Sequence, residues 1–387
     1  MAELGCAEAY EAVIDWMGGG RPFTSPSVDS LTAVKWSRTI NDISDASVTI
    51  AKAAAGPECC AQISNLHPWA HELSLYRDSH LVWQGPITSE VKETRSSLVV
   101  SAQDVLARVA RTGNTHQIRY TTTEPDSDGR HQGPVQWIAY DLLDRNLRKS
   151  PLSVPPDASN LMPYVVRYDS ATSVSFEKDG SDDASVWNEY LLTIFSEELV
   201  KRGLEFTTSG RSIILRGPAT REDRPQARLT PDDIVGDVEV TRSGTNAATY
   251  AFATSQQSQN ITGGLTVGVG QVGTPYGRLD LIVRTDADHV SEGDLRQMAR
   301  QALVSRYPAP VTISVPTGSR LAATAPVSIH QLVPGMRIDF VSTGFCLEVE
   351  QAFRLSDVDV EWGSSGEQVA ISLVPLDALS DIEEGLS

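Results

Sequence analysis

Short runs of alternating apolar and polar residues, separated by turn residues, constrain the fold of this chain more than any other feature. The clearest pair is Leu73–Arg77 and Leu81–Gly85, which flank the polar tip Asp78–His80. Successive side chains of a strand point to opposite faces of a sheet, so this alternation predicts strands that are buried on one face. Two such runs around a short polar tip predict an antiparallel hairpin.

Further strand patterns fill the first and last thirds of the chain. They lie at residues 28–36, 38–50, 98–100, 237–241, 248–253, 311–315, 337–341, 346–350 and 369–373. Each of these thirds also has one helix pattern. Ser101 and Asp104 begin one apolar stripe, and Ser291 and Asp294 begin the other, which stops before Pro308. Ser-x-x-Asp ahead of an apolar stripe is a typical helix start, so we expect one helix in each of these thirds.

The middle third mixes helices with a hairpin. The predicted elements are a helix that begins at Pro134, with Trp137, Ile138, Leu142 and Leu143 at helical spacing, a longer helix at 184–202, and a hairpin at 204–208 and 212–216. Polar, proline-containing stretches at 121–133 and 151–163 predict loops or boundaries.

Length and element order together predict the domain organisation. The chain has 387 residues, whereas a single core rarely grows beyond ~250–300 residues. We predict an α+β fold that is predominantly antiparallel β. Two β-rich domains at residues 1–115 and 236–387, each with one packed helix, flank an α+β insertion domain at 116–235.

Composition narrows the classes of function. The formal net charge is -18, and phosphate binding needs clustered lysine and arginine, which argues against a nucleic-acid-binding surface. The charge favours a role in solubility alone, and it is also compatible with a surface that nucleic acid slides past without binding. No apolar run reaches the ~18–20 residues of a membrane span. The N-terminus lacks a signal-peptide pattern, so we expect folding in a cytoplasm. The four cysteines, Cys6, Cys59, Cys60 and Cys346, are then expected to be buried free thiols.

No motif in the chain predicts an enzyme. Gly268–Gly273 matches G-x-G-x-x-G, but no helix follows, so a glycine-rich loop between strands is expected instead of a nucleotide site. His67 and His71 are four residues apart, but Pro68 lies between them, which favours a loop that packs Trp69 over a metal site. Histidines and cysteines show no triad signature, and acidic pairs among 50 carboxylates carry little information. We therefore predict no catalytic, cofactor-binding or metal-binding residue, and no cofactor.

Several segments along the chain share their order with one family of proteins. They are Arg38–Ser44 (R-x-I-N-D-I-S), Leu75–Arg77 with Leu81–Ile87 (a hairpin with W-x-G-P-I), Val99–Leu106 (a strand leading to A-x-D), the helix and hairpin within 184–216, Tyr276–Leu279 with the helix from Ser291, and Leu332–Arg337 (an L-V-P-G turn). Together they resemble minor tail proteins of phages that infect actinobacteria, which are similar to baseplate hub proteins. The first 20 residues have no counterpart.

The resemblance implies a structural virion protein that forms the tail-tip hub of a siphovirus. Hubs of this kind are homotrimers whose subunits each carry two tube-like β-domains, here residues 1–115 and 236–387, so that three copies form a pseudo-sixfold ring. The implied partners are further copies of the chain, the distal tail protein or tail tube, the tape-measure protein, tail fibre or spike proteins, genomic DNA passing through the lumen, and indirectly the host cell surface. Assembly would take place in the host cytoplasm, and the ring would help gate DNA exit.

Two other functions compete with the hub. A tail-associated cell-wall hydrolase requires a pocket in which titratable groups with perturbed pKa values converge. A carbohydrate- or receptor-binding tail module predicts an exposed aromatic patch, built from Trp137, Trp187 or Trp362.

Overall fold

A computed structural model gives the conformation of most of the chain. The described residues are 3–16, 22–24, 30–54, 65–88, 91–114, 118–121, 131–132, 135–148, 165–168, 184–186, 189–200, 203–210, 212–217, 226–242, 244–245, 247–255, 266–270, 277–285, 295–296, 299, 302–303, 306 and 311–376. Contacts group the chain into two compact units. One unit comprises residues 1–237, 316–340 and 352–387, and the other comprises 238–315 and 341–351.

The hairpin predicted at Leu73–Gly85 is confirmed. β5 (His71–Arg77) and β6 (His80–Pro86) pair antiparallel, with Arg77 opposite His80. Asp78 and Ser79 have positive φ values of 48° and 68°, the pattern of a two-residue type I′ turn. β1 (Tyr10–Trp16) and β2 (Pro22–Thr24) extend the hairpin to a four-stranded sheet in the order β2-β1-β5-β6.

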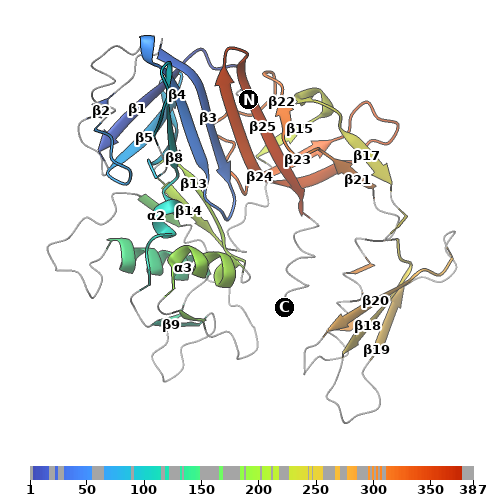
Figure 1. The fold of residues 1–387 in the computed structure, drawn as a ribbon. Coiled ribbons are helices and arrows are strands. Elements are labelled where there is room, and N and C mark those ends of the chain that lie inside the picture. Colours follow the sequence, from blue (N-terminus) through green and yellow to red (C-terminus); the bar gives the residue numbers. More distant parts are fainter. Residues whose placement is uncertain are drawn as a thin grey trace. The chain divides into compact units, whose positions relative to one another are not determined.

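Strands from both ends of the chain build one ten-stranded sheet (Figure 1). Its main path is β16-β22-β25-β24-β3-β4-β8-β7, and β15 and β23 pair beside this path. The strands are β3 (Leu31–Thr39), β4 (Asp45–Ala51), β7 (Val91–Glu93), β8 (Ser97–Gln103), β15 (Ala227–Leu229), β16 (Ile234–Val235), β22 (Ser319–Leu321), β23 (Arg337–Val341), β24 (Glu350–Gly363) and β25 (Gly366–Pro375). Antiparallel pairing of β24 with β3 places Val360 opposite Trp36. The first and last thirds of the chain therefore meet in one sheet.

The core of this β-rich region contains side chains from both sheets. Fully or almost fully buried are Val34, Trp36, Val48, Ile50 and Val360 of the larger sheet and Tyr10, Ile14, Leu73 and Leu75 of the smaller one. The Trp36 indole N–H donates to the Tyr10 hydroxyl (3.2 Å), which links the two sheets inside the core. Full burial of a large apolar side chain contributes about 1.5–3 kcal/mol, so the alternation seen in the sequence supplies the stabilising face of each strand.

A second core joins the helices of the middle third to a hairpin. α3 (Val135–Leu143), which continues as the π-helical segment η2 (Asp144–Arg148), and the hairpin of β13 (Glu205–Ser209) and β14 (Ser212–Arg216) confirm two predicted elements. α2 (Leu106–Val109), α4 (Leu191–Thr193) and its π-helical extension η3 (Ile194–Leu199) pack into the same cluster. β11 (Val165–Tyr168) pairs parallel to β14, and β9 (Ile118–Thr121), β10 (His131–Gln132) and β12 (Ala184–Val186) form a small separate sheet.

Several predicted boundaries are wrong, because strand pairing overrides the local pattern. The strand pattern predicted at 38–50 is divided, since β3 ends at Thr39 and β4 begins at Asp45. β8 pairs with β4 as far as Gln103, so Ser101 lies in a strand and α2 begins only at Leu106. Residues 184–186 pair with β9, so the long helix predicted from 184 starts at Leu191. The strand predicted at 346–350 begins only at Glu350, where β24 starts. Pairing partners distant in sequence decide such boundaries, and local propensity does not report them.

The second unit has its own small α+β core. β17 (Glu239–Arg242) pairs with β21 (Val311–Ser314), and β18 (Tyr250–Ser255) lies between β19 (Thr266–Gly270) and β20 (Asp280–Thr285). Leu295 and Ala299, from the predicted helix, are buried against Ala251 and Ala253. The predicted caps Ser291 and Asp294 lie outside the described residues.

Two further predictions about this region and the thiols are corrected. Gly268 and Gly270 lie in β19, so that part of the expected glycine loop is a strand, and residues 271–273 lie outside the described chain. Cys6 and Cys346 are exposed, not buried, and Cys59 and Cys60 are not among the described residues.

The predicted fold class is confirmed, since antiparallel pairs dominate and helices are few. The domain boundaries at 115 and 235 stay a prediction. Within the described part of the chain, none of the helices is both long and apolar enough to cross a membrane.

Candidate functional surface

One face of the ten-stranded sheet carries polar side chains in place of a packed core. Along β3 and β24, Trp36 and Val360 are buried whereas Lys35 and Glu361 are exposed. A shallow groove of about 480 Å³ lies here, lined by Lys35, Trp36, Ser37, Asp45, Ala46, Ser47, Ser101, Ala102, Asp359, Val360 and Glu361. We call the side chains of Lys35, Ser37, Asp45, Ser47, Ser101, Asp357, Asp359 and Glu361 the open face.

Strand pairing arranges the open face in rows. Lys35 lies opposite Glu361 on one side and Ser47 on the other, and Ser47 lies opposite Ser101. Serines of β3, β4 and β8 thus share the groove with Lys35 and Asp45, and the carboxylates of Asp359 and Glu361 lie on its β24 side. Such a surface offers hydroxyls and carboxylates to water.

An acidic row runs along β24 on this face. Asp357, Asp359 and Glu361 alternate with buried residues and therefore point to the same side. Partial burial, together with the charges of Asp357 and Glu361, raises the pKa of Asp359. Lys35 Nζ contacts Glu361 at 2.6 Å, but both side chains are 59% exposed, so this pair contributes little stability. The row concentrates negative potential on the open face.

Arg38 holds the back of this sheet against distant segments. Its side chain is buried and donates to the carbonyls of Val82 (2.6 Å), Leu332 (2.8 Å) and Ile329 (3.1 Å). The guanidinium also lies 4.9 Å from the centre of the Trp36 ring. Burial lowers the pKa of Arg38 to about 10, so the group stays charged at neutral pH. Among the described residues no carboxylate pairs with it, and carbonyl dipoles stabilise the charge instead.

The rest of the Arg38–Ser44 segment connects the sheet to the second core. Asn41 has φ 58°, its N–H donates to the Phe206 carbonyl (2.8 Å), and its side-chain oxygen accepts from the Phe206 N–H (2.9 Å). The buried Asp104 carboxylate accepts from the Ser44 N–H (3.0 Å), the Ser44 hydroxyl (2.7 Å) and the Thr208 hydroxyl (2.8 Å). Burial raises the pKa of Asp104 to about 6, although these hydrogen bonds work in the opposite direction.

Arg77 and Glu367 form a buried ion pair between the hairpin and β25. Arg77 donates through Nε and Nη2 to the two carboxylate oxygens (2.9 and 2.7 Å), a bidentate geometry. The Tyr10 hydroxyl donates to the same carboxylate at 2.7 Å. Burial raises the pKa of Tyr10, and Glu367 raises it further, so the hydroxyl keeps its proton.

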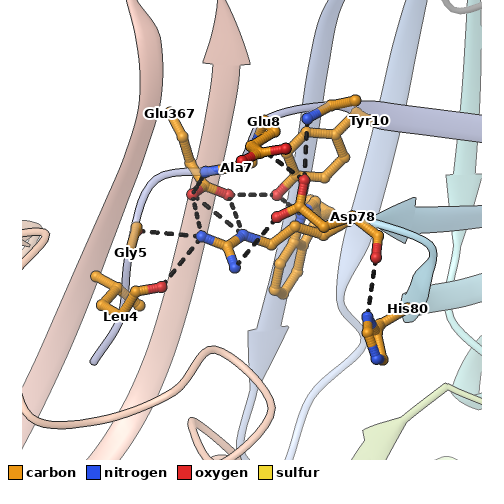
Figure 2. A network of polar contacts seen from close by, with 11 residues as sticks. Leu4, Gly5, Ala7, Glu8, Tyr10, Asp78, His80 and Glu367 are labelled. Atoms are coloured by element: carbon orange, nitrogen blue, oxygen red, sulfur yellow. Dashed lines mark hydrogen bonds and ion pairs between the residues drawn. The ribbon is translucent and has the colours of Figure 1, made fainter. Parts of the chain in front are cut away.

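The same network fixes the N-terminal residues ahead of β1, which have no counterpart in the family pattern. Figure 2 shows Leu4, Gly5, Ala7 and Glu8 around Asp78 and Glu367. Arg77 Nη2 donates to the carbonyls of Leu4 (3.2 Å) and Gly5 (3.1 Å). Asp78 accepts from the N–H groups of Glu8 (2.9 Å) and Ala9 (3.0 Å). Almost all of these contacts go to backbone atoms, so they fix the path of the segment and depend little on its side chains.

The L-V-P-G turn is held by two arginines from other elements. Arg216 of β14 donates to the Pro334 carbonyl and Arg354 of β24 to the Gly335 carbonyl, both at 2.8 Å. Arg354 is buried and pairs with Glu205 at 3.1 Å. Gly335 has φ 89°, and a Cβ there would lie 2.3 Å from Arg216 Nη1. The residues of the L-V-P-G turn therefore have a structural role, because they hold β14 and β24 to this turn.

The remaining residues that the sequence singled out do not converge on one site. His71 is buried at the start of β5, and its ring lies 6.3 Å from that of His67. Among the described residues no three histidine, cysteine or acidic side chains gather to hold a metal. Trp137 is half-buried against the second core and Trp362 contacts Tyr10, whereas Trp187 lies outside the described residues. Ion pairs such as Arg77 with Glu367, 290 positions apart, and Glu205 with Arg354, 149 positions apart, have no local signal in the sequence.

Comparison with known proteins gives structural matches over nearly the whole chain. No protein-family model and no curated protein sequence matches it. The 43 kDa tail protein of prophage MuSo2 from Shewanella oneidensis has a similar structure (TM-score 0.55, 12% identity, covering 95% of this chain and 98% of that one). A tail protein from Neisseria meningitidis MC58 (0.51, 12%, 94% and 96%) and prophage tail protein gp18 from Listeria monocytogenes EGD-e (0.50, 9%, 96% and 97%) also match. The chain therefore shares the fold of these prophage tail proteins from end to end.

Proposed function

We propose that the chain is a structural virion protein that forms the hub ring at the tip of a phage tail. The observation that carries the proposal is the end-to-end match to prophage tail proteins, with more than nine-tenths of both chains covered in each case. The ordered motifs at Arg38–Ser44 and Leu332–Arg337 support a place among the minor tail proteins of actinobacteriophages. Hydrogen bonds of their side chains and backbone connect distant elements of the fold, as a structural role requires.

In this proposal the ring is a homotrimer in which the open face lines the channel. Cyclic symmetry uses one heterologous interface repeatedly and closes without free edges. An acidic and serine-lined wall would repel DNA phosphates and stay hydrated, so genomic DNA would pass without specific binding. The three-domain layout, with tube-like domains at 1–115 and 236–387, is part of this proposal.

The partners follow from a position at the end of the tail. The ring would contact the distal tail protein or tail tube on one side and fibres or spike on the other, with the tape-measure protein and DNA in its channel. It would be assembled in the host cytoplasm, meet the host cell surface only indirectly and help gate DNA exit. The proposal gives the chain no catalytic role.

The test is the oligomeric mass of the purified full chain together with a low-resolution image. A mass of three chains of 41.9 kDa and a ring with a central channel are expected. A compact monomer that degrades peptidoglycan would overturn the hub and favour the hydrolase. A monomer that binds isolated cell-wall glycan without cleaving it would favour the carbohydrate-binding module.

A further inference from the structure

An exposed tryptophan lies at the end of β1. The Trp16 side chain is 48% exposed, and its ring contacts the ring of buried His71 at a centroid distance of 4.2 Å. A tryptophan can bury 150–250 Å², so leaving about half of it in water forgoes a large stabilisation. Large aromatic side chains left on a surface commonly serve contacts with another molecule.

Trp69 lies in the neighbouring loop in a strained backbone conformation. Its φ is 66°, in the left-handed region that a bulky residue rarely adopts and that costs about 1–3 kcal/mol. Two hydrogen bonds maintain it: the Trp69 N–H donates to the Ile87 carbonyl, and Arg108 Nη2 donates to the Trp69 carbonyl, both at 2.8 Å. The fold thus maintains a costly conformation that fixes where the indole lies.

Two arginines accompany this indole. The guanidinium carbons of Arg108 and Arg111 lie 5.5 and 5.8 Å from the centre of the Trp69 ring, within cation–π range. Arg111 is exposed, and among the described residues neither arginine forms an ion pair. In a chain with 50 acidic and 32 basic residues, these two arginines together make this part of the surface locally positive.

We propose that Trp16, Trp69, Arg108 and Arg111, the Trp–Arg patch, bind the acidic surface of a second copy of this chain. Trp16, the last residue of β1, contacts His71, the first residue of β5, and Trp69, two residues before His71 in the chain, contacts Arg108 of α2 and the nearby Arg111. Tryptophan and arginine are the side chains that most often dominate protein interfaces. The second copy is the favoured occupant because its net charge of -18 complements the patch. A cationic patch that meets an acidic surface elsewhere on the next copy is a heterologous contact, the kind that closes a ring.

This inference rests on the proposed ring and names the side chains that close it. The experiment measures the mass of the full-length chain by light scattering during dilution. Trp16→Ala and Arg111→Glu are the variants, because neither residue fixes the backbone of the Trp69 loop, whereas Arg108 does. Arg95→Glu, at an exposed arginine in the turn before β8, is the matched charge control. Far-ultraviolet circular dichroism and the melting temperature check that each variant is folded.

Each patch variant is expected to weaken self-association about tenfold or more, as truncation of an interface hot spot does. Arg95→Glu is expected to associate like the unchanged chain, and added salt should weaken association of the unchanged chain. Benzoylphenylalanine at position 16 should cross-link to acidic segments of a second copy. If the unchanged chain is a monomer, the proposed ring itself fails. If it is an oligomer and the patch variants associate like the control, the ring stands and the patch inference is overturned.

Discussion

At the scale of single residues, Arg38 is a buried side chain that connects distant segments of the chain. Its planar fork donates to three carbonyls from two segments of the chain. Lysine has one nitrogen and cannot reproduce this geometry. Arg38→Lys is therefore expected to lower the free energy of unfolding by about 2–4 kcal/mol, measured by urea denaturation.

The control for this prediction is the reverse exchange at a neighbouring position. Lys35 is exposed on the same strand, so Lys35→Arg should change the free energy of unfolding by less than about 0.5 kcal/mol. Equal urea midpoints for Arg38→Lys and Lys35→Arg would show that the fork has no structural role.

Asp104 makes stability depend on pH. Because burial raises its pKa in the folded chain to about 6, above the ordinary ~3.9 of an unfolded chain, the folded state binds the proton more tightly. Its contribution is fully present below the unfolded pKa and is lost as pH rises through about 6. Between about pH 5.2 and about pH 7.5, the stability of the unchanged chain should fall by roughly 1 kcal/mol relative to Asp104→Asn, which does not titrate.

Urea denaturation of both proteins at the two pH values measures this difference. Both values lie above the sequence pI of 4.8, so the chain keeps a net negative charge throughout. A difference that is constant with pH, or one that grows as pH rises, would contradict a raised pKa at Asp104.

At the scale of elements, the β5–β6 turn carries a correctable strain. Ser79 has φ 68°, a conformation that glycine adopts without penalty. Ser79→Gly is expected to raise the free energy of unfolding by about 0.5–1 kcal/mol, measured as a higher urea midpoint. Ser96→Gly, at an exposed serine in another turn, should not stabilise the chain. A lower midpoint for Ser79→Gly would mean that its side chain contributes more than the backbone strain costs.

The L-V-P-G turn tests close packing around a glycine. Gly335→Ala introduces a Cβ 2.3 Å from Arg216 Nη1 at φ 89°, so both strain and displacement of the arginine are expected. The loss should be about 2–4 kcal/mol in urea denaturation. Gly318→Ala is the matched control, because Gly318 has φ 77° with nothing within 4 Å of the added Cβ, and it should lose only about 1 kcal/mol. Equal losses would show that Arg216 moves aside freely.

Elements could be predicted from the sequence where the pattern is local, and not where pairing is distant. The β5–β6 and β13–β14 hairpins could be predicted because each alternating run is followed directly in the sequence by turn residues and a second run. The extension of β8 to Gln103 could not be, because it depends on the pairing of Gln103 with the distant Asp45 of β4. The joining of β24 to β3 was missed for the same reason, and with it the open face, which exists only once those strands lie together. In the sequence, the side chains of the open face do not differ from ordinary exposed positions of a strand.

At the scale of the whole molecule, the two faces of the ten-stranded sheet have different roles. One face packs Trp36, Val48 and Val360 into the core, and the other presents serines and carboxylates to water. Arg38, Asp104 and Arg354 hold the buried side to neighbouring elements through hydrogen bonds across long stretches of chain. The packing and hydrogen bonds that hold the sheet thus lie on its buried side. The open face is therefore available to line the proposed channel.

The acidic row on β24 gives the last prediction. It tests whether carboxylates on the open face, and not the net charge of the whole chain, keep DNA from binding. Replacing Asp357, Asp359 and Glu361 by lysine turns the row on β24 into a cationic stripe. We expect the purified variant to bind double-stranded DNA in a fluorescence anisotropy titration, with an affinity that falls steeply with added salt, whereas the unchanged chain does not bind. The matched control replaces the exposed residues Glu3, Glu11 and Asp237 by lysine, which alters net charge equally without forming a stripe along one strand. Equal DNA binding by both triple variants would attribute the effect to net charge alone, and no binding by either would mean that the open face is not what keeps DNA from adhering.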